Sequence, residues 1–440
     1  MTRSAARLME PLPTGRLFAY GLFGLPLAMA ARPLYVHLPK FYGDELGLNL
    51  ALVGLILLLA RLVDALQDPL LGYWSDRAPG RKRFVAMSLP LLTLGMLGLF
   101  NPPALSADAL GWWLLGCLVV VYLGFSMASI SYQAWGAQLS AERDERTRIT
   151  ASRETFTLLG VVTAATLPAL LGAGGAEQLS RFALVFVLLL LVCALVTLLF
   201  SPSEHLFVPV QMSSQQSSQE GAFRALLRPL SNKAFRKLLV VFALNGIASA
   251  IPATLVMFFM ADVLQLGEQG GWFLALYFIS GVLGMPLWVF VSRRFGKQRA
   301  WLAGMGLSVA AFVWAYGLGA GDVPAFAIVC VMSGVALGAD LALPPSLLAD
   351  AMDEHVPGGD DGAPGGGAYF GLWNLVTKLN LALAAGISLP LLAGLGYVPG
   401  APGGAAALSI AYCLIPCALK LLAMAALWRW SVLSMSKPGA

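Results

Sequence analysis

Charged residues are scarce in this chain of 440 residues. Asp, Glu, Lys and Arg together supply 12% of the sequence, against about 25% in soluble domains. Hydrophobic residues supply 58%, and the mean hydropathy is +0.77. The shortage of charge excludes an ordinary soluble domain and predicts a membrane protein.

The motifs of nucleotide-driven, zinc-dependent and nucleophilic chemistry are also missing. The glycine-rich run at residues 357–367 is not followed by a Lys-Ser or Lys-Thr pair, so it is not a Walker loop. All five cysteines fall within apolar stretches, where we expect buried free thiols. The sequence therefore predicts neither an enzyme nor an ATP-driven pump, and no bound cofactor.

Long apolar runs make up most of the chain. Residues 182–200 carry no charge, and a membrane-spanning helix needs about 20 such residues. About twelve comparable spans follow from this criterion. They are centred near residues 27, 61, 93, 124, 162, 191, 249, 280, 309, 337, 380 and 417.

Basic residues alternate between the loops that join these spans. They gather before the first span and after the second, fourth, sixth, eighth and twelfth, whereas the opposite loops hold only Lys40 and Arg181. This positive-inside pattern predicts that both termini are cytoplasmic and that the first helix is retained rather than cleaved. The bilayer, not nucleic acid, is therefore the expected partner of a chain with a net charge of +5.

A polar stretch divides the chain into two related halves. We predict an N-terminal six-helix bundle at residues 1–200, a cytoplasmic linker at 201–233 and a C-terminal six-helix bundle at 234–440. The segment 68–84 aligns with 285–301, where Pro69 matches Pro286 and Arg77 matches Arg294. Parallel six-span repeats are the plan of the major facilitator fold, which binds its substrate near the membrane midplane.

Three charges lie in the second predicted span. Arg61, Asp64 and Asp68 are spaced three and four residues apart, so they share one helix face, and each costs about 2.5–3.5 kcal/mol in hydrocarbon. The second half has uncharged residues at the corresponding positions, namely Phe278, Gly281 and Met285. The architecture can therefore build this helix without the charges.

Three explanations of these charges stay open. The two carboxylates can bind a hard cation such as Na⁺. One of them can instead take up a proton, because burial and a neighbouring anion favour its neutral form. Alternatively, Arg61 forms a static salt bridge with either acid, although a single pair would not need two acids.

Other charges fall within later spans. Asp340 lies near the midplane of span ten, and Lys378 lies on a polar stripe of span eleven that also carries Trp373, Asn374, Thr377 and Asn380. Such residues face a cavity more often than lipid. Asp340 either pairs with Lys378 or binds substrate. Arg32 and Lys420 are weaker candidates, because both can extend to a membrane interface.

The motifs at residues 64–77, 131–160, 347–354 and 367–378 together resemble the glycoside–pentoside–hexuronide:cation symporters, the melibiose permease-like family of the major facilitator superfamily. The resemblance covers nearly the whole chain. It implies an all-α integral membrane protein with about twelve transmembrane helices in two parallel six-helix repeats. It also implies symport coupled to Na⁺ or H⁺.

The resemblance assigns roles to residues at matching positions. Asp64 and Asp68 correspond to the cation carboxylates, which would hold Na⁺ if sodium is the coupling ion, and Ser126 corresponds to a hydroxyl ligand. Gln67 replaces an asparagine between the two acids. Ala28, Ser129 and Gln133 stand where the sugar transporter has two acids and a tryptophan, which speaks against a melibiose-like galactoside. The expected substrate contacts are Arg153, Lys378, Asn245, Gln133, Asp340, Trp373 and Asn374.

The function we expect is cation-coupled symport of a small solute, a sugar or glycoside-like compound, by alternating access. The alternatives are a lysolipid or amphiphile symporter or permease and a non-transporting membrane sensor. Ion pairs on the cytoplasmic side would close the inner gate, and the residues expected there are Asp76, Arg77, Arg81, Lys82, Asp144, Glu145 and Arg146. We expect a multi-pass monomer in a plasma membrane, the bacterial inner membrane.

Overall fold

The computed structural model describes residues 12–36, 38, 41–77, 80–140, 142–171, 176–202, 227–266, 270–353, 366–397 and 404–430. Every regular element in these ranges is a helix. The chain divides into two compact units. The first comprises Met1–Pro229 with Asp360–Leu375, and the second comprises Leu230–Gly359 with Val376–Ala440.

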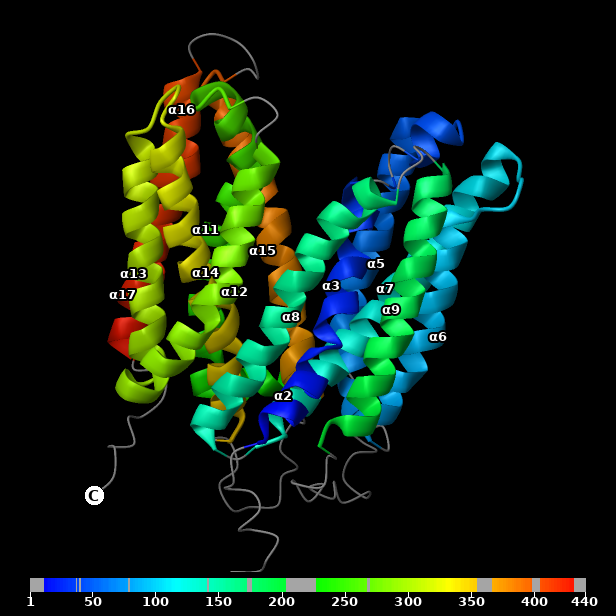
Figure 1. Ribbon diagram of the computed structural model, residues 1–440, viewed down its shortest axis with the longest axis horizontal. Helices are drawn as coiled ribbons and strands as arrows, with labels where there is room; N and C mark the ends of the chain where they lie inside the picture. The colour runs from blue at the N-terminus through cyan, green and yellow to red at the C-terminus, as the bar shows by residue number, and fades with distance from the viewer. Residues whose placement is uncertain are drawn as a thin grey trace, which may run out of the picture. The chain divides into compact units, whose positions relative to one another are not determined.

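The first unit holds the helices of the first six predicted spans (Figure 1). α3 packs on α8, α5 packs on α7, and α6 packs on both α7 and α9. The elements are α2 (Thr14–Gly21), α3 (Gly24–Val36), η1 (Phe41–Glu45), α5 (Leu50–Arg77), α6 (Arg81–Phe100), α7 (Ala107–Ala137), α8 (Arg143–Leu170) and α9 (Ala176–Phe200).

The second unit repeats this arrangement with the later spans. α12 packs on α14, and α13 packs on both α14 and α17. Its elements are α11 (Lys233–Phe258), η3 (Phe259–Val263), α12 (Gly270–Phe295), α13 (Lys297–Tyr316), α14 (Val323–Asp353), α16 (Ala405–Ser409), η5 (Ile410–Leu414) and α17 (Ile415–Trp430). The short helix η2 (Arg228–Ser231) begins in the first unit and ends in the second. α15 (Gly366–Gly394) begins in the first unit and continues in the second.

The repeat extends to local backbone geometry. A π-helical turn ends the first span of each half, η1 in one and η3 in the other. The following residues close both turns identically, because Leu46 and Leu48 donate to Phe41 and Tyr42 just as Leu264 and Leu266 donate to Phe259 and Met260. This match lies outside the segments that the sequence alignment covered.

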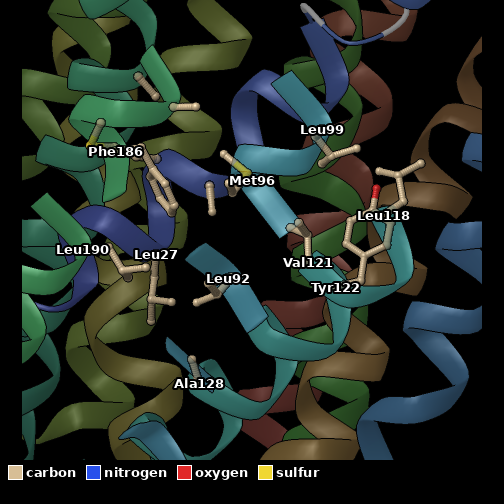
Figure 2. Packing of buried hydrophobic residues seen from close by; sticks show 14 of the residues in the cluster. Leu27, Leu92, Met96, Leu99, Leu118, Val121, Tyr122, Ala128, Phe186 and Leu190 are labelled. Atoms are coloured by element: carbon tan, nitrogen blue, oxygen red, sulfur yellow. The ribbon is translucent and has the colours of Figure 1, made fainter. Parts of the chain in front are cut away.

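The core of the first unit is built from apolar side chains of several helices. Figure 2 shows them converging from α3, α6, α7 and α9, with Leu27, Leu92, Val121 and Phe186 among those labelled. A second cluster fills the other unit around Phe259, which stacks on Tyr412 with ring centroids 4.2 Å apart. Each half therefore has a hydrophobic core of its own.

Among the described helices, eight are long and apolar enough to cross a membrane unaided. α5, α8 and α13 are not among them. α5 carries Arg61, Asp64 and Asp68, α8 begins with a run of charges, and α13 is a shorter helix that begins with Lys297 and Arg299. The first span is divided into α2 and α3, and the last contains the π turn η5. With these pieces joined, the described helices correspond to the twelve predicted spans.

The predicted linker is only partly described. Residues 203–226 lie outside the described residues. At its end, the side chain of Asn232 caps α11 by accepting hydrogen bonds from the backbone N–H groups of Ala234 and Phe235 at 2.9 and 3.2 Å. An N-cap of this kind satisfies donors that the first helical turn leaves open.

Candidate functional site

The two acids of α5 point into the first unit. Asp64 is 5% exposed and Asp68 is fully buried, whereas Leu58, Leu62 and Leu66 on other faces of the helix are exposed. A buried carboxylate loses its hydration and needs a partner of opposite charge or hydrogen-bond donors. The arrangement excludes an orientation of both acids toward the surrounding lipid.

Asp64 joins the other predicted cation ligands in one cluster. Its Oδ1 accepts a hydrogen bond from Ser126 Oγ on α7 at 3.1 Å and from Gln67 Nε2 at 3.3 Å. Asp68 follows one helical turn later, on the same face as Asp64. The structure thus places Asp64, Gln67 and Ser126 together, and we call these residues with Asp68 the acid cluster.

The donor chemistry of the acid cluster suits a hard cation. Two carboxylates, a hydroxyl and an amide offer oxygen ligands, which Na⁺ prefers by the same logic as Ca²⁺ and Mg²⁺. No group of three or more His, Cys, Asp or Glu side chains suited to a metal occurs among the described residues. The described residues therefore do not form a zinc-type site. The role of the acid cluster in cation binding stays a prediction.

The structure places Arg61 on an exposed face of α5. The alternative of a salt bridge between Arg61 and one of the acids also stays open.

The start of α15 packs closely on α5 within the first unit. A methyl group at Gly371 would lie 2.7 Å from the backbone oxygen of Asp68, and one at Gly367 would meet Gly72. Only glycine permits such an approach of two helix backbones. The segment that follows the glycine-rich loop is thereby held against the helix that carries the acids.

Three of the predicted substrate residues lie near one another in the first unit. Gln133 Nε2 donates to Asn374 Oδ1 at 3.3 Å, and Asn374 Nδ2 donates to Ser129 Oγ at 3.4 Å. Trp373, the neighbour of Asn374 on α15, is 3% exposed. Asn374 of the polar stripe therefore contacts α7, and both the cavity-lining role and the substrate role remain predictions.

Arg153 is buried and paired with its own neighbour in the chain. Its Nε and Nη2 donate to Glu154 Oε1 at 2.9 and 2.7 Å, so the pair is locally neutral. Tyr20 and Tyr132 lie close by and bond to each other's backbone carbonyl groups. The sequence analysis missed Glu154, although an acid beside a buried arginine within a span was a usable signal.

Asp340 does not pair with Lys378, and this expectation is corrected. Its described partners are Lys420 Nζ at 2.8 Å, Trp301 Nε1 at 2.9 Å and Ser249 Oγ at 3.3 Å. Lys420 also donates to Asn245 Oδ1 at 2.8 Å. Because these residues come from α11, α13, α14 and α17, tertiary packing and not spacing along one helix determines the partner.

The expectation for Lys420 is also corrected. Its side chain is only 3% exposed, so it does not extend to a membrane interface. Lys378 is half-buried on α15, whereas the side chain of Arg32 lies outside the described residues. The second unit thus contains a buried group that we call the Asp340 cluster, formed by Asn245, Ser249, Trp301, Asp340 and Lys420.

Asp76 is the centre of the predicted inner gate. Its two oxygens accept the backbone N–H groups of Gly367 and Ala368 at 2.7 and 2.8 Å, at the N-terminus of α15, and Arg81 Nη2 lies 2.8 Å from Oδ1. A carboxylate at a helix N-terminus complements the helix dipole. Arg81 also donates to Gln138 Oε1 at 2.9 Å, a partner that the sequence did not indicate.

The remaining gate residues make other contacts. Arg77 lies over the ring of Tyr73 at 3.5 Å, and Lys82 donates to the carbonyl groups of Leu198 and Ser201 at 3.2 and 2.9 Å. The ion pairs that we expected of Arg77 and Lys82 stay a prediction. On α8, Glu145 pairs with Arg148 at 2.8 Å, Arg146 Nε donates to the Ser140 carbonyl at 2.9 Å, and Asp144 is half-buried.

Comparison with known proteins adds a family and a fold. The family model of MFS/sugar transport proteins matches residues 17–433. The bacterial homologue of the iron transporter ferroportin, solved in an outward-facing state, superposes with a TM-score of 0.69 at 17% identity. The match covers 95% of this chain and 100% of that chain, and it shows that the fold is the major facilitator fold.

Relatives of this chain carry different solutes. It is 25% identical to the mouse sphingosine-1-phosphate transporter MFSD2B, over 87% of this chain and 81% of the relative. It is 27% identical to a 2,3-dihydroxypropane-1-sulfonate exporter assigned in Salmonella typhimurium, over 73% and 71%. It is 21% identical to the isoprimeverose transporter of Lactiplantibacillus pentosus, over 78% and 72%.

Proposed function

Because the chain belongs to the MFS/sugar transport protein family, we propose that it is a symporter that couples the movement of Na⁺ or H⁺ to the uptake of a small solute. The family consists of secondary transporters, so the chain is a multi-pass membrane transporter and not an enzyme. The coupling ion, the class of solute and the residues that bind them are the content of the proposal.

The observation that carries the proposal is the burial of two carboxylates on α5. Asp64 and Asp68 are 5% and 0% exposed, and Asp64 faces the hydroxyl of Ser126. Two anions one helical turn apart repel each other in a medium of low dielectric constant. A cation that binds between them, or a proton on one of them, removes this repulsion.

Ion binding then favours the conformation that accepts the solute. A tenfold Na⁺ gradient supplies about 1.4 kcal/mol, and a membrane potential of 100 mV supplies about 2.3 kcal/mol for each charge. One coupled ion therefore suffices to concentrate a neutral solute several hundredfold, on the order of 10² to 10³. When the ion leaves, the two acids again disfavour that conformation.

The solute that we propose is a sugar or glycoside-like compound. The predicted contacts are Gln133, Asn374, Trp373 and Arg153 in the first unit and Asn245, Asp340 and Lys378 in the second. The isoprimeverose transporter among the relatives supports a sugar. The protein acts as a monomer in a plasma membrane, the inner membrane of a bacterium.

The bonds of Asp76 provide the inner gate. Its hydrogen bonds to the N-terminus of α15 and its ion pair with Arg81 hold α5, α6 and α15 together at their cytoplasmic ends. These bonds must break when the cytoplasmic side opens. The gate therefore stabilises the state that is closed to the cytoplasm.

A second candidate is the transport of an amphiphile with a phosphate group. The similarity to the sphingosine-1-phosphate transporter favours it, because that relative is matched over 81% of its length. The same cation site would serve either solute. The two candidates differ in whether sugars or lysolipids compete for uptake.

The test is uptake by purified protein in proteoliposomes with and without an inward Na⁺ or H⁺ gradient. Asp68→Asn keeps the shape of the side chain but removes its charge, so we expect cation-driven accumulation to fall at least tenfold. Asp108→Asn makes the same chemical change at an exposed position at the start of α7 and serves as the matched control.

The result expected for Asp108→Asn is unchanged uptake. Accumulation that persists in a folded Asp68→Asn protein would end the proposal that α5 carries the coupling ion. Uptake by the wild type that ignores both gradients would end the proposal of symport itself.

A further inference from the structure

Four helices of the second unit meet at the Asp340 cluster. Lys420 Nζ on α17 lies 2.8 Å from Asp340 Oδ2 on α14 and 2.8 Å from Asn245 Oδ1 on α11. Trp301 Nε1 on α13 donates to Asp340 Oδ1 at 2.9 Å. One ammonium group therefore holds the carboxylate and the amide next to each other.

The lysine lies behind the acid that it neutralises. The Lys420 side chain is 3% exposed, whereas the Asp340 side chain is 11% exposed. Ser249, which donates to Asp340 Oδ2, is half-buried as well. Of the two charged groups, the carboxylate is therefore the more accessible one.

The hydrogen bonds decide which groups the cluster can offer to a solute. An ammonium group only donates hydrogen bonds, so the atom of Asn245 that faces Lys420 must be its carbonyl oxygen. The N–H groups of the Asn245 side chain are therefore not used by Lys420. On Asp340, Oδ2 already accepts from Lys420 and Ser249, whereas Oδ1 accepts from Trp301. An ionised carboxylate has about four lone-pair sites, so Oδ1 retains capacity for one more donor.

The cluster therefore combines a hydrogen-bond acceptor and a hydrogen-bond donor with no net charge. Adjacent hydroxyl groups match this combination, because one donates to a carboxylate while the other accepts from an amide. An anionic group would meet the carboxylate, and a cationic group would compete with Lys420. The chemistry favours a neutral pair of hydroxyls over either ion.

We propose that Asp340 and Asn245 bind a vicinal diol of the transported solute, and that Lys420 and Trp301 are positioning residues that hold them. This inference rests on the proposed function and names the chemical group that its substrate carries. Lys420 neutralises Asp340, so the solute need not supply a cation. Trp301 holds the carboxylate by its other oxygen, Oδ1.

Lys420 on α17 is the cation that Asp340 contacts among the described residues. α11 and α13 contribute the uncharged side chains of Asn245, Ser249 and Trp301. Removal of Lys420 therefore leaves the carboxylate of Asp340 with uncharged donors.

The first experiment separates hydroxyl recognition from charge recognition. Binding to the purified full-length protein in detergent is measured by calorimetry for 2,3-dihydroxypropane-1-sulfonate, propane-1-sulfonate and isoprimeverose. The two sulfonates carry the same charge, and only one carries a diol. We expect at least tenfold tighter binding of the diol sulfonate than of propane-1-sulfonate, and loss of this preference in Asp340→Asn and Asn245→Ala.

Two outcomes overturn the inference at this stage. Equal affinity for the two sulfonates means that charge, and not the diol, is recognised. A wild-type protein that binds neither 2,3-dihydroxypropane-1-sulfonate nor isoprimeverose has no diol site of this kind.

The second experiment tests the positioning role of Lys420 with a conservative variant and a double variant. In Lys420→Met, we expect the diol preference to fall at least tenfold, because Asp340 loses the cation that holds it. Lys420→Arg should retain the preference, and Lys420→Met/Asp340→Asn should lose no more of it than Asp340→Asn alone. Lys233→Met, at an exposed lysine of α11, is the matched control.

A purely structural lysine predicts a different pattern. The preference for the diol sulfonate would then persist in Lys420→Met, which contradicts the inference. Binding is measured without an ion gradient, so a failure of cation coupling leaves this readout unaffected. The proposed function and the diol site can therefore fail separately.

Discussion

α5 and α12 are the second spans of two related halves, yet they pack on their partner helices by different means. At the contact of α5 with α7, Asp64 bonds to Ser126 at 3.1 Å and Ser75 bonds to Ser131 at 2.8 Å. At the contact of α12 with α14, small residues close the gap instead. A methyl group at Gly284 would lie 3.1 Å from Val335 Cα, and one at Gly338 would lie 3.1 Å from the Gly281 oxygen.

The comparison separates packing from function. Small residues suffice to hold two helices together in a membrane, because they permit close approach of the backbones. The second half uses this solution and has Gly281 and Met285 where the first half has Asp64 and Asp68. The acids of α5 are therefore not required for packing, and a separate role must account for their cost.

Other features are the same in both halves. A glycine with positive φ precedes α6 and α13, Gly80 at 110° and Gly296 at 87°. The first residue of each helix is a buried cation. Arg81 pairs with Asp76 on α5 at 2.8 Å, whereas Lys297 pairs with Asp350 on α14 at 2.7 Å. We expect a structural purpose for the shared glycine and cation, and a functional purpose for Asp64, Asp68 and Asp76, whose counterparts in the second half are not acidic.

The largest expected effect tests a shared feature. Lys297→Met removes the cation beside a nearly fully buried carboxylate and should lower the free energy of unfolding by about 3 kcal/mol. Arg81→Met should cost less, because the side chain of Asp76 is 11% exposed, whereas that of Asp350 is 1% exposed. Thermal unfolding in detergent measures both, and a larger loss in Arg81→Met would contradict this ranking.

A smaller effect tests the glycine contact of α12. A methyl group at Gly334 would overlap the backbone oxygen of Tyr277 and lie 2.8 Å from Ser280 Cβ, so Gly334→Ala should cost about 1–3 kcal/mol. Gly116 on α7 has open space, and Gly116→Ala should stabilise by about 0.4–1 kcal/mol. Unfolding temperatures that shift in the same direction would refute the close contact of α12 with α14.

The smallest expected change in stability tests the contact of α5. Ser126→Ala removes the donor to Asp64 and should change the free energy of unfolding by less than about 1 kcal/mol. It should nevertheless raise the Na⁺ or H⁺ concentration for half-maximal uptake about tenfold, or about 1.4 kcal/mol. Ser88→Ala removes a buried hydroxyl that bonds only to the Val85 carbonyl within α6, and uptake should not change. If the Ser126→Ala and Ser88→Ala variants need the same ion concentration for half-maximal uptake, Ser126 has no role in ion binding.

Much of the fold could be predicted from the sequence, because its signals are local or repeated. Apolar length and the alternation of basic loops indicated the spans, and the matched segments around Asp68 and Met285 indicated the repeat. The division of the first span into α2 and α3 was not foreseen. Pro26 in the first turn of α3 lacks the N–H group that would continue the bonds of α2, and this local signal was overlooked.

Most of the acid cluster could be predicted from the sequence for a different reason. Asp64, Gln67 and Asp68 are neighbours on one helix, so their spacing alone placed them together. Ser126 lies 62 residues away and entered only through the family resemblance. Its contact with Asp64 depends on how α5 packs on α7, which no local pattern determines.

The Asp340 cluster could not be predicted in the same way. Asp340 and Lys420 are 80 residues apart on different helices, and Lys378 was a nearer candidate in the sequence. The choice between the two lysines depends on which helix packs on α14 at that depth. Trp301, which completes the cluster, follows the basic residues Lys297 and Arg299, and this pattern indicates a cytoplasmic loop rather than a binding site.

Direct binding of Na⁺ or H⁺ to the detergent-purified protein tests the central claim most directly. Calorimetric titration with NaCl, and a parallel measurement of proton uptake on a pH step, should give saturable binding in the wild type that is lost in Asp64→Asn/Asp68→Asn. The same loss should not occur in Asp108→Asn. Undiminished ion binding by the folded double variant would show that α5 does not hold the coupling ion.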